Sequence, residues 1–245
     1  ETDETPASSP SLSLQLLEIA TSPTASKFLL MLLTPLKRRS KVLDPLEYEV
    51  MGPIPTLLNP ATGKEVPTSK KNPETRRKEL LQYLSKPLKE LATEQTEALM
   101  RSIAGSQVLK EICLNLGNSN SSGAGGKEIQ GAIIDACRTS LEQEKDDGGF
   151  NLFEEKVSQI FLKQMLTTSS FAEDFYQAFK SDLMQKVAST NRGAFVVTAL
   201  LKNTSLRTNV LKELDQDGIL EQSKEEGRST AGFEALLKEM RGGES

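Results

Sequence analysis

The sequence predicts an all-α protein, an α-solenoid built from helical repeats. Five stretches share one pattern, in which a small residue is followed by apolar residues three, four, seven and eight positions later. They are ASKFLLMLL from Ala25, GSQVLKEIC from Gly105, SQIFLKQML from Ser158, GAFVVTALL from Gly193 and, without the apolar seventh position, GFEALLKEM from Gly232. Residues at these offsets lie on one helical face, so each stretch predicts a helix that buries one stripe. The small residue at its start allows a neighbouring helix to approach closely.

A second helix is predicted before each of these five. The sequence favours helices over residues 12–20, 88–102, 127–143, 171–187 and 205–223. A single pair of this kind cannot bury its apolar stripes alone, so the pairs are expected to stack on their neighbours. No run of residues favours a strand over this helical interpretation.

The distances between the five small residues support a repeat and locate its insertions. They lie 80, 53, 35 and 39 residues apart, and the two shorter distances are typical of two- or three-helix repeats. The longest contains a proline-rich connector, residues 35–73, which cannot form one continuous helix, and an extra helix over 74–84. The domain plan is a disordered tail over 1–11 and one array over 12–245.

A glycine-rich loop at residues 117–126 accounts for much of the 53-residue spacing. Together with the lysine that follows, it superficially matches a phosphate-binding loop, which needs the pattern GxxxxGK[ST] after a buried strand. Here Ser121 stands in place of the first glycine and Glu128 in place of the hydroxyl residue, and residues 109–116 have helical spacing. The loop is therefore interpreted as a flexible connection between repeats.

Composition argues against catalysis. The chain has no histidine, which removes Ser-His and Cys-His pairs and the commonest metal ligand. Cys113 and Cys137 are expected to be buried, reduced thiols. We therefore expect no enzyme activity, no metal and no cofactor. No apolar run approaches the ~20 residues of a membrane span, and residues 1–11 are acidic and polar where a secretory signal would be basic and apolar. An intracellular protein is expected.

Charge is unevenly distributed along the chain. The net charge is −4, but residues 34–90 carry 12 Lys and Arg against 7 Asp and Glu, whereas residues 105–245 carry 16 against 21. Such a local excess of positive charge favours contact with nucleic-acid phosphates, although a solvated surface is an open alternative. The candidate nucleic-acid-binding residues are Lys37, Arg38, Arg39, Lys41, Lys64, Lys70, Lys71, Arg76, Arg77 and Lys78. Only Tyr48 and Tyr83 are aromatic in this part, so a base-stacking surface is not expected.

Three stretches carry a family resemblance: SKKNPETRRKELLQYLSKPLKEL (69–91), ASTNRGAFVVTALLKN (188–203) and STAGFEALLKEM (229–240). In these the sequence resembles the C-terminal part of the nucleolar pumilio-like proteins of the Puf-A group, including their CPL region. The resemblance implies an array of pumilio-like repeats and a non-catalytic, RNA-binding role in assembling the large ribosomal subunit (pre-60S) in the nucleolus. It also implies ribosomal RNA and pre-ribosomal proteins as partners, translational repression of some messenger RNAs, and neither a membrane nor a small-molecule substrate.

Sequence-reading pumilio repeats use paired side chains near the start of each inner helix to contact base edges. Transferred to this chain by the resemblance, the pairs are Ser26 with Leu30, Ser106 with Lys110, Gln159 with Lys163, Ala194 with Thr198, and Phe233 with Leu237. None is a recognised base-reading pair. Any RNA contact is therefore expected to involve phosphate and shape.

The residues leave a second function open, a purely protein-binding scaffold of the HEAT or armadillo kind. The sequence pI of about 5.2 favours that alternative for the later repeats. In the RNA-binding interpretation, the basic connector and the start of the following helix contact ribosomal RNA, and the acidic C-terminal repeats hold protein partners.

Overall fold

The computed structural model describes residues 12–52, 54–68, 70–116, 124–142, 151–215, 218–219 and 231–242. The predicted tail over 1–11 and most of the predicted loop over 117–126 lie outside these residues. The N-terminal half contains α1 (Leu12–Thr21), α2 (Ser26–Leu33), the 3₁₀ helix η1 (Leu36–Lys41), α3 (Pro45–Met51), β1 (Thr56–Leu58), β2 (Glu65–Pro67), α4 (Pro73–Glu94), α5 (Thr96–Arg101) and α6 (Ile103–Leu116). The rest contains α7 (Ala124–Glu142), α8 (Lys156–Met165), α9 (Ser169–Phe179), α10 (Asp182–Ala188), α11 (Asn191–Leu201), α12 (Arg207–Glu213) and α14 (Ala231–Met240).

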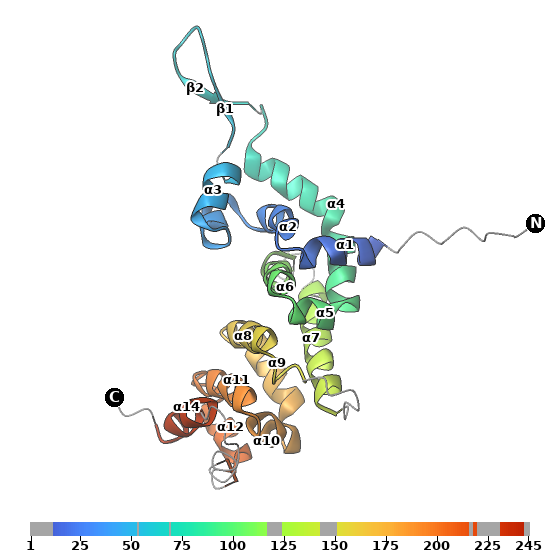
Figure 1. Cartoon of the computed structure of the whole chain (residues 1–245), viewed down its shortest axis with the longest axis vertical. Helices are drawn as coiled ribbons and strands as arrows, with labels where there is room; N and C mark the ends of the chain where they lie inside the picture. Colours follow the sequence, from blue (N-terminus) through green and yellow to red (C-terminus); the bar gives the residue numbers. More distant parts are fainter. Residues whose placement is uncertain are drawn as a thin grey trace, which may run out of the picture.

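The predicted all-α solenoid is confirmed. The five stretches that share the small-residue pattern form α2, α6, α8, α11 and α14, and each of these inner helices packs against the next. The preceding helices form an outer row, in which α1 packs on α4, α4 on α7 and α7 on α9. Figure 1 shows the result as an elongated stack that runs from the N-terminal helices to α14.

The small residues at the starts of the inner helices have the expected packing role. A Cβ added at Gly232 would clash with the carbonyl oxygen of Asn191 in α11, and one at Gly193 would clash with that of Val187. At Gly105 the nearest atom would be the carbonyl oxygen of Leu99, at 2.8 Å. These glycines therefore let helix backbones approach more closely than a side chain allows.

Three predicted outer helices have different bounds in the structure. The helix predicted over 205–223 ends at Glu213, because Leu214 is extended. The predicted break between 74–84 and 88–102 is absent at Pro87, because α4 continues to Glu94 and the chain breaks at Gln95 instead. The helix predicted over 171–187 is divided into α9 and α10. At the break Ser181 has φ +68°, and its N–H donates to the Glu213 carboxylate at 2.7 Å. A tertiary contact thus overrides the local helical pattern.

The connector over 35–73 contains its own short elements. Asp44 begins α3 with a capping box, since its side chain accepts from the Glu47 N–H while the Glu47 carboxylate accepts from the Asp44 N–H. β1 and β2 then form an antiparallel hairpin in which Leu57 pairs with Val66. The expectation that no segment favours a strand is wrong here. The hairpin connection includes Gly63 at φ +63°, a conformation that suits glycine.

The core is continuous through the stack but changes in character along it. The N-terminal helices bury mainly leucine side chains, such as Leu30, Leu33 and Leu91. The later helices bury phenylalanines, including Phe175 stacked on Phe179 with ring centroids 4.4 Å apart. Cys113 and Cys137 are both buried and unpaired, which confirms their predicted burial.

Among the described residues, no single helix is both long and apolar enough to cross a bilayer. The pair α1 and α2 meets the length and hydropathy requirement only when taken together, across a bend of 96°.

Candidate nucleic-acid interface

The predicted basic residues divide into two groups by their exposure. Lys37, Lys41, Lys64, Lys70, Lys71, Arg76 and Lys78 are exposed, whereas Arg38 and Arg39 are half-buried and Arg77 is buried. The structure brings η1 and the first turn of α4 together over the C-terminal end of α2, where the Leu36 N–H donates to the Glu74 carboxylate at 3.4 Å. The predicted basic residues are therefore arranged around the C-terminal end of α2.

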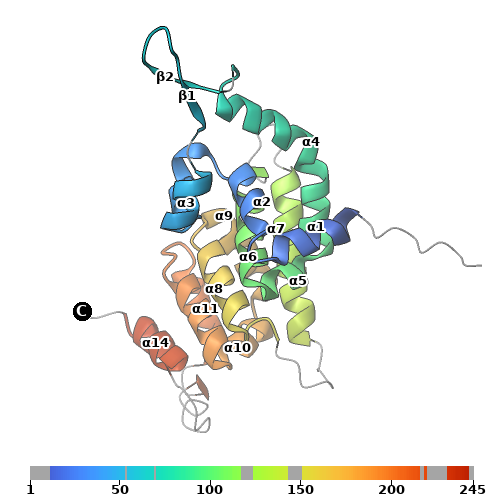
Figure 2. The same ribbon diagram turned by 45° about the horizontal axis from the view of Figure 1, so that its top comes forward.

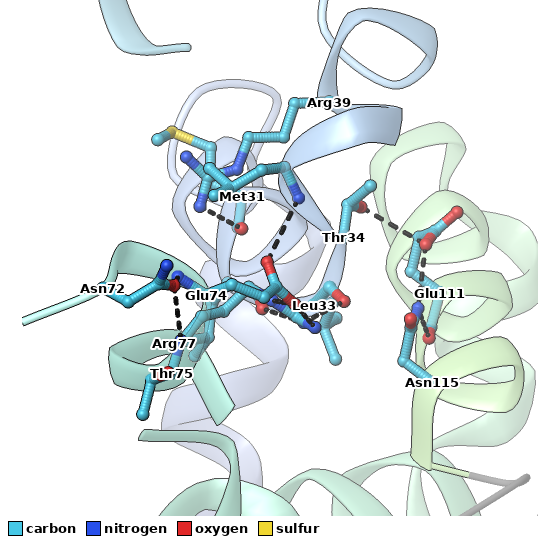
Figure 3. Close-up of polar contacts among 12 residues, drawn as sticks. Met31, Leu33, Thr34, Arg39, Asn72, Glu74, Thr75, Arg77, Glu111 and Asn115 are labelled. Carbon is cyan, nitrogen blue, oxygen red and sulfur yellow. Dashed lines mark hydrogen bonds and ion pairs between the residues drawn. The ribbon is translucent and has the colours of Figure 1, made fainter. Parts of the chain in front are cut away.

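Arg77 is the centre of this arrangement (Figure 3). Its Nη1 donates to the carbonyl oxygens of Leu32 at 3.1 Å and Leu33 at 2.9 Å, and its Nε and Nη2 both donate to the Glu74 carboxylate. Leu32 and Leu33 end α2, and the last carbonyls of a helix have no partner within it. A cation at this end also opposes the negative pole of the helix dipole. Arg77 is thus a capping residue.

Arg39 occupies the same helix end from η1. Its Nη2 donates to the carbonyl oxygen of Met31 at 3.1 Å, while its Nε is buried without a hydrogen-bond partner among the described residues. Burial lowers the pKa of Arg39, and the nearby Arg77 charge lowers it further. The hydrogen bonds from Arg77 hold the pKa of the intervening Glu74 below its ordinary value. The Glu74 carboxylate pairs with Arg77, and its charge raises the pKa of Arg39 and so partly offsets the repulsion between the two guanidinium groups.

Arg38 links the connector to α6. Its Nη2 lies 2.8 Å from the carboxylate of Glu111, which is only 2% exposed. Thr34 and Asn115 also donate to this carboxylate, at 3.2 and 3.0 Å. A buried carboxylate needs such partners to offset the removal of its hydration. Arg38 therefore stabilises the packing of the connector against α6.

The exposed cations form the surface that remains. Lys71 pairs with Glu79 at 2.5 Å. By contrast, Lys37, Lys41, Lys70, Arg76 and Lys78 form no ion pair with a carboxylate in the described parts of the chain. Lys37 and Lys41 lie on η1, Arg76 and Lys78 lie in the first two turns of α4, and Lys70 lies three residues before α4. We call these five residues the basic patch.

The inner helices present a second surface. Seven of the ten positions proposed for base reading are buried, including Leu30, Ala194 and Phe233, so they contact the core and not a ligand. Instead, the side chain two residues after the small residue is exposed or half-exposed in all five inner helices. These residues are Lys27, Gln107, Ile160, Phe195 and Glu234. Their chemistry is mixed and contains no repeated base-reading pair.

Open grooves lie between successive inner helices on this face. One groove, of about 710 Å³, lies between α8, α11 and α14 and includes Lys163 and Lys202. The Lys163 ammonium lies 5.2 Å from the centre of the Phe195 ring, a cation–π contact. A smaller groove of about 260 Å³ separates α6 from α8, where Lys110 donates to Gln164 at 2.8 Å. The charge count by segment missed these lysines because acidic residues on other faces offset them.

The described residues contain no group of three or more His, Cys, Asp or Glu side chains that could hold a metal ion. In addition, burial raises the pKa of the Cys113 thiol to about 12, which keeps it protonated and unreactive near neutral pH.

This architecture is similar to that of known proteins. Residues 23–174 match the family model described as the CPL (NUC119) domain. A solved structure titled "Crystal structure of human Puf-A" superposes with a TM-score of 0.70 at 21% sequence identity, over 93% of this chain and 42% of that one. The chain thus spans less than half the length of the human Puf-A chain. A search of curated proteins returns no match.

The family match covers the connector, both groups of cations and the helices that hold them. It confirms the resemblance, drawn from the sequence, to Puf-A-type pumilio-like proteins with a CPL region. The match also extends over more than half of the chain. The protein therefore belongs to the CPL (NUC119) domain family, and its fold is that of Puf-A.

Proposed function

We propose that this chain is a non-catalytic RNA-binding factor that acts in assembly of the large ribosomal subunit in the nucleolus. The basic patch contacts ribosomal RNA through phosphates and without reading its sequence. Translational repression of messenger RNA follows from the same kind of contact. The Puf-A resemblance supports the nucleolar setting, and the geometry of the patch supports the mode of contact.

One observation carries this proposal: some cations of this region make structural contacts, and others are left exposed. Arg38, Arg39 and Arg77 are used in holding η1 and α4 over the end of α2. Lys37, Lys41, Lys70, Arg76 and Lys78 are left exposed on or next to those anchored elements. Cations on a fixed support release phosphate counterions on binding without first having to be ordered. Contacts of this kind position a nucleic acid but do not specify its bases.

The proposal is tested by reversing the charge of the basic patch. The variant carries Lys37→Glu, Lys41→Glu, Lys70→Glu, Arg76→Glu and Lys78→Glu, and binding of a single-stranded RNA is measured as a function of salt. We expect the slope of log K against log salt to fall by about 0.7 for each phosphate that the variant no longer neutralises. An unchanged slope would remove RNA binding from this patch.

A matched control separates a local effect from a change in total charge. Lys127, Lys180, Lys186, Lys212 and Lys238 are also exposed, and they lie on or beside helices outside the patch. Reversing all five changes the net charge by the same amount. This control is expected to retain most of the salt slope of the unmodified chain.

A purely protein-binding scaffold is the second candidate. The acidic excess after residue 105 favours it for the later repeats. Purification of bound proteins with and without nuclease distinguishes the two functions, because partners bound through RNA are released on digestion while direct partners remain.

A further inference from the structure

The exposed apolar side chains of the described residues are concentrated in the connector. Fifteen large hydrophobic residues are exposed, and seven of them lie between Leu46 and Val66. These residues lie in α3, in the β1–β2 hairpin or between the two, and we call residues 44–67, which include the Asp44 cap of α3, the arm. Concentrated apolar exposure on a folded protein marks an interaction surface.

The outward face of α3 is apolar where a surface helix is normally polar. Leu46 is 70% exposed and Val50 is 76% exposed, and residues four apart lie on the same helical face. No residue of α3 is buried. The helix is held by its Asp44 cap and by the ion pair of Glu47 with Lys27 at 3.0 Å. Its apolar face is thus available for a contact outside the stack.

The hairpin exposes further apolar side chains. All residues of both strands are exposed, and the cross-strand partners Leu57 and Val66 are 63% and 41% exposed. In Figures 1 and 2 the hairpin extends away from the helical stack, next to α3. An isolated two-stranded hairpin is only marginally stable in water. Covering its apolar face with a partner would stabilise it.

The charge of the arm is opposite to that of the basic patch. Asp44, Glu47, Glu49 and Glu65 are its carboxylates, and Lys64 is its only cation. Lys27 neutralises Glu47 but leaves the other three. The basic patch, by contrast, lies directly before and after the arm in the sequence. A positively charged segment would be repelled by the basic patch and attracted to the arm.

We propose that the arm binds a basic, partly apolar segment of another protein. Leu46, Val50, Leu57 and Val66 supply the apolar contact, and Asp44, Glu49 and Glu65 supply the charge. RNA fits this surface poorly, since its phosphates would be repelled by the carboxylates and only Tyr48 could stack on a base. The inference goes beyond RNA binding by the basic patch and does not depend on it.

The test uses the whole chain and a defined probe. A fluorescein-labelled peptide of alternating lysine and valine residues is titrated with the protein, and anisotropy gives the affinity. We expect this peptide to bind at least tenfold more tightly than peptides of alternating glutamate and valine or of lysine and serine. Hydrogen exchange of the amides in β1 and β2 is expected to slow when the lysine–valine peptide binds.

Two double variants locate the contact. The arm variant carries Val50→Ser and Leu57→Ser, and the control carries Leu80→Ser and Tyr83→Ser, which replace side chains that are 47% and 82% exposed on α4. All four side chains are exposed, so both variants are expected to melt at the temperature of the unmodified chain. The arm variant should bind the lysine–valine peptide at least tenfold more weakly, and the control should bind it normally.

Equal binding by the arm variant and the control would overturn the proposal, as would preference for the glutamate–valine peptide. Binding of single-stranded RNA is measured with the same proteins and is expected to be unchanged in the arm variant. A loss of RNA affinity in that variant would assign the arm to the RNA surface and would also overturn the proposal. Loss of RNA binding in the basic-patch variant alone leaves it intact.

Discussion

Residues 12–116 and residues 151–242 both end an inner helix with an arginine, but they take that arginine from different places. In the later region Arg207 donates to the carbonyl oxygen of Leu201, the last residue of α11, and pairs with Glu239 at 2.6 Å. Arg207 follows Leu201 by six residues. In the earlier region Arg77 performs the same task for Leu33 across the whole connector.

The two caps also differ in burial. The side chain of Arg77 is 8% exposed, whereas that of Arg207 is 27% exposed. The inserted connector therefore does not remove the cap of the repeat; it moves the cap to a later helix and covers it with η1. A solenoid can thus accept a long insertion when another residue caps the last carbonyls of the interrupted helix. The inserted residues then project outward from that capped end.

The largest effect is expected where helices are in closest contact, in the later region. Gly232→Ala places a Cβ against the backbone of Asn191 and should destabilise the docking of α14 by about 3 kcal/mol. Gly105→Ala in the earlier region meets a less severe contact, and a loss of about 1 kcal/mol is expected. Chemical denaturation measures both effects, and hydrogen exchange of α14 locates the effect of Gly232→Ala.

A third glycine serves as the control. Gly131 lies on α7 with no atom within 4 Å of an added Cβ. Gly131→Ala should therefore stabilise the chain by about 0.5–1 kcal/mol, because alanine has the higher helix propensity. Equal losses at Gly131 and Gly232 would show that close backbone approach is not the cause.

The second-largest effect on stability is expected at the two capping arginines, and replacing one should cost more than replacing the other. Arg77→Ala removes the donor to the Leu32 and Leu33 carbonyls and the cation paired with Glu74, and it is expected to cost about 2–3 kcal/mol in free energy of unfolding. Arg207→Ala affects more exposed groups, and a cost of about 1 kcal/mol is expected. Urea denaturation of the two variants gives the comparison, and a larger loss for Arg207 would refute the assignment of the buried cap.

Acid should weaken the cap in the earlier region. The pKa of Glu74 is held below its ordinary value by Arg77, so its contribution to stability is present above that ordinary value and is lost as pH falls through the pKa of the folded state. The difference in melting temperature between the unmodified chain and Glu74→Gln should shrink between about pH 6 and pH 3. A difference that is constant over this range would contradict the ion pair.

The smallest expected effect concerns the chemical reactivity of the two thiols and not the stability of the chain. Cys113 lies in the earlier region and Cys137 in α7, and burial raises the pKa of both thiols. Neither is expected to react with a thiol-specific disulfide reagent until the chain is denatured. Rapid reaction of one thiol in the native protein would identify a segment that opens locally.

The sequence predicted the repeat because the pattern is local and physical. Glycine at 105, 193 and 232 and the apolar stripes after it determine which helix faces pack, and the structure confirms this. The bounds of the outer helices were less predictable. The break at Ser181 depends on Glu213, and nothing in the nearby sequence indicates that contact.

The basic patch was predicted only in part. Counting charges gathered all the cations of the connector but could not separate Arg77 from Arg76, since the difference arises from the carbonyls of α2 and from Glu74. The arm was missed for a related reason. Its strands are three residues long and lie among prolines, which gives a weak pattern.

Neighbouring arginines allow the most direct test of the central claim, that buried arginines hold the connector while exposed cations contact phosphate. Arg76→Gln and Arg77→Gln are compared in urea denaturation and in the salt dependence of RNA binding, at a temperature where both are folded. Arg76→Gln should reduce the salt slope by about 0.7 and leave stability within about 0.5 kcal/mol. Arg77→Gln should lower stability by about 2 kcal/mol and leave the slope unchanged. The opposite assignment, or two variants that behave alike, would contradict the account.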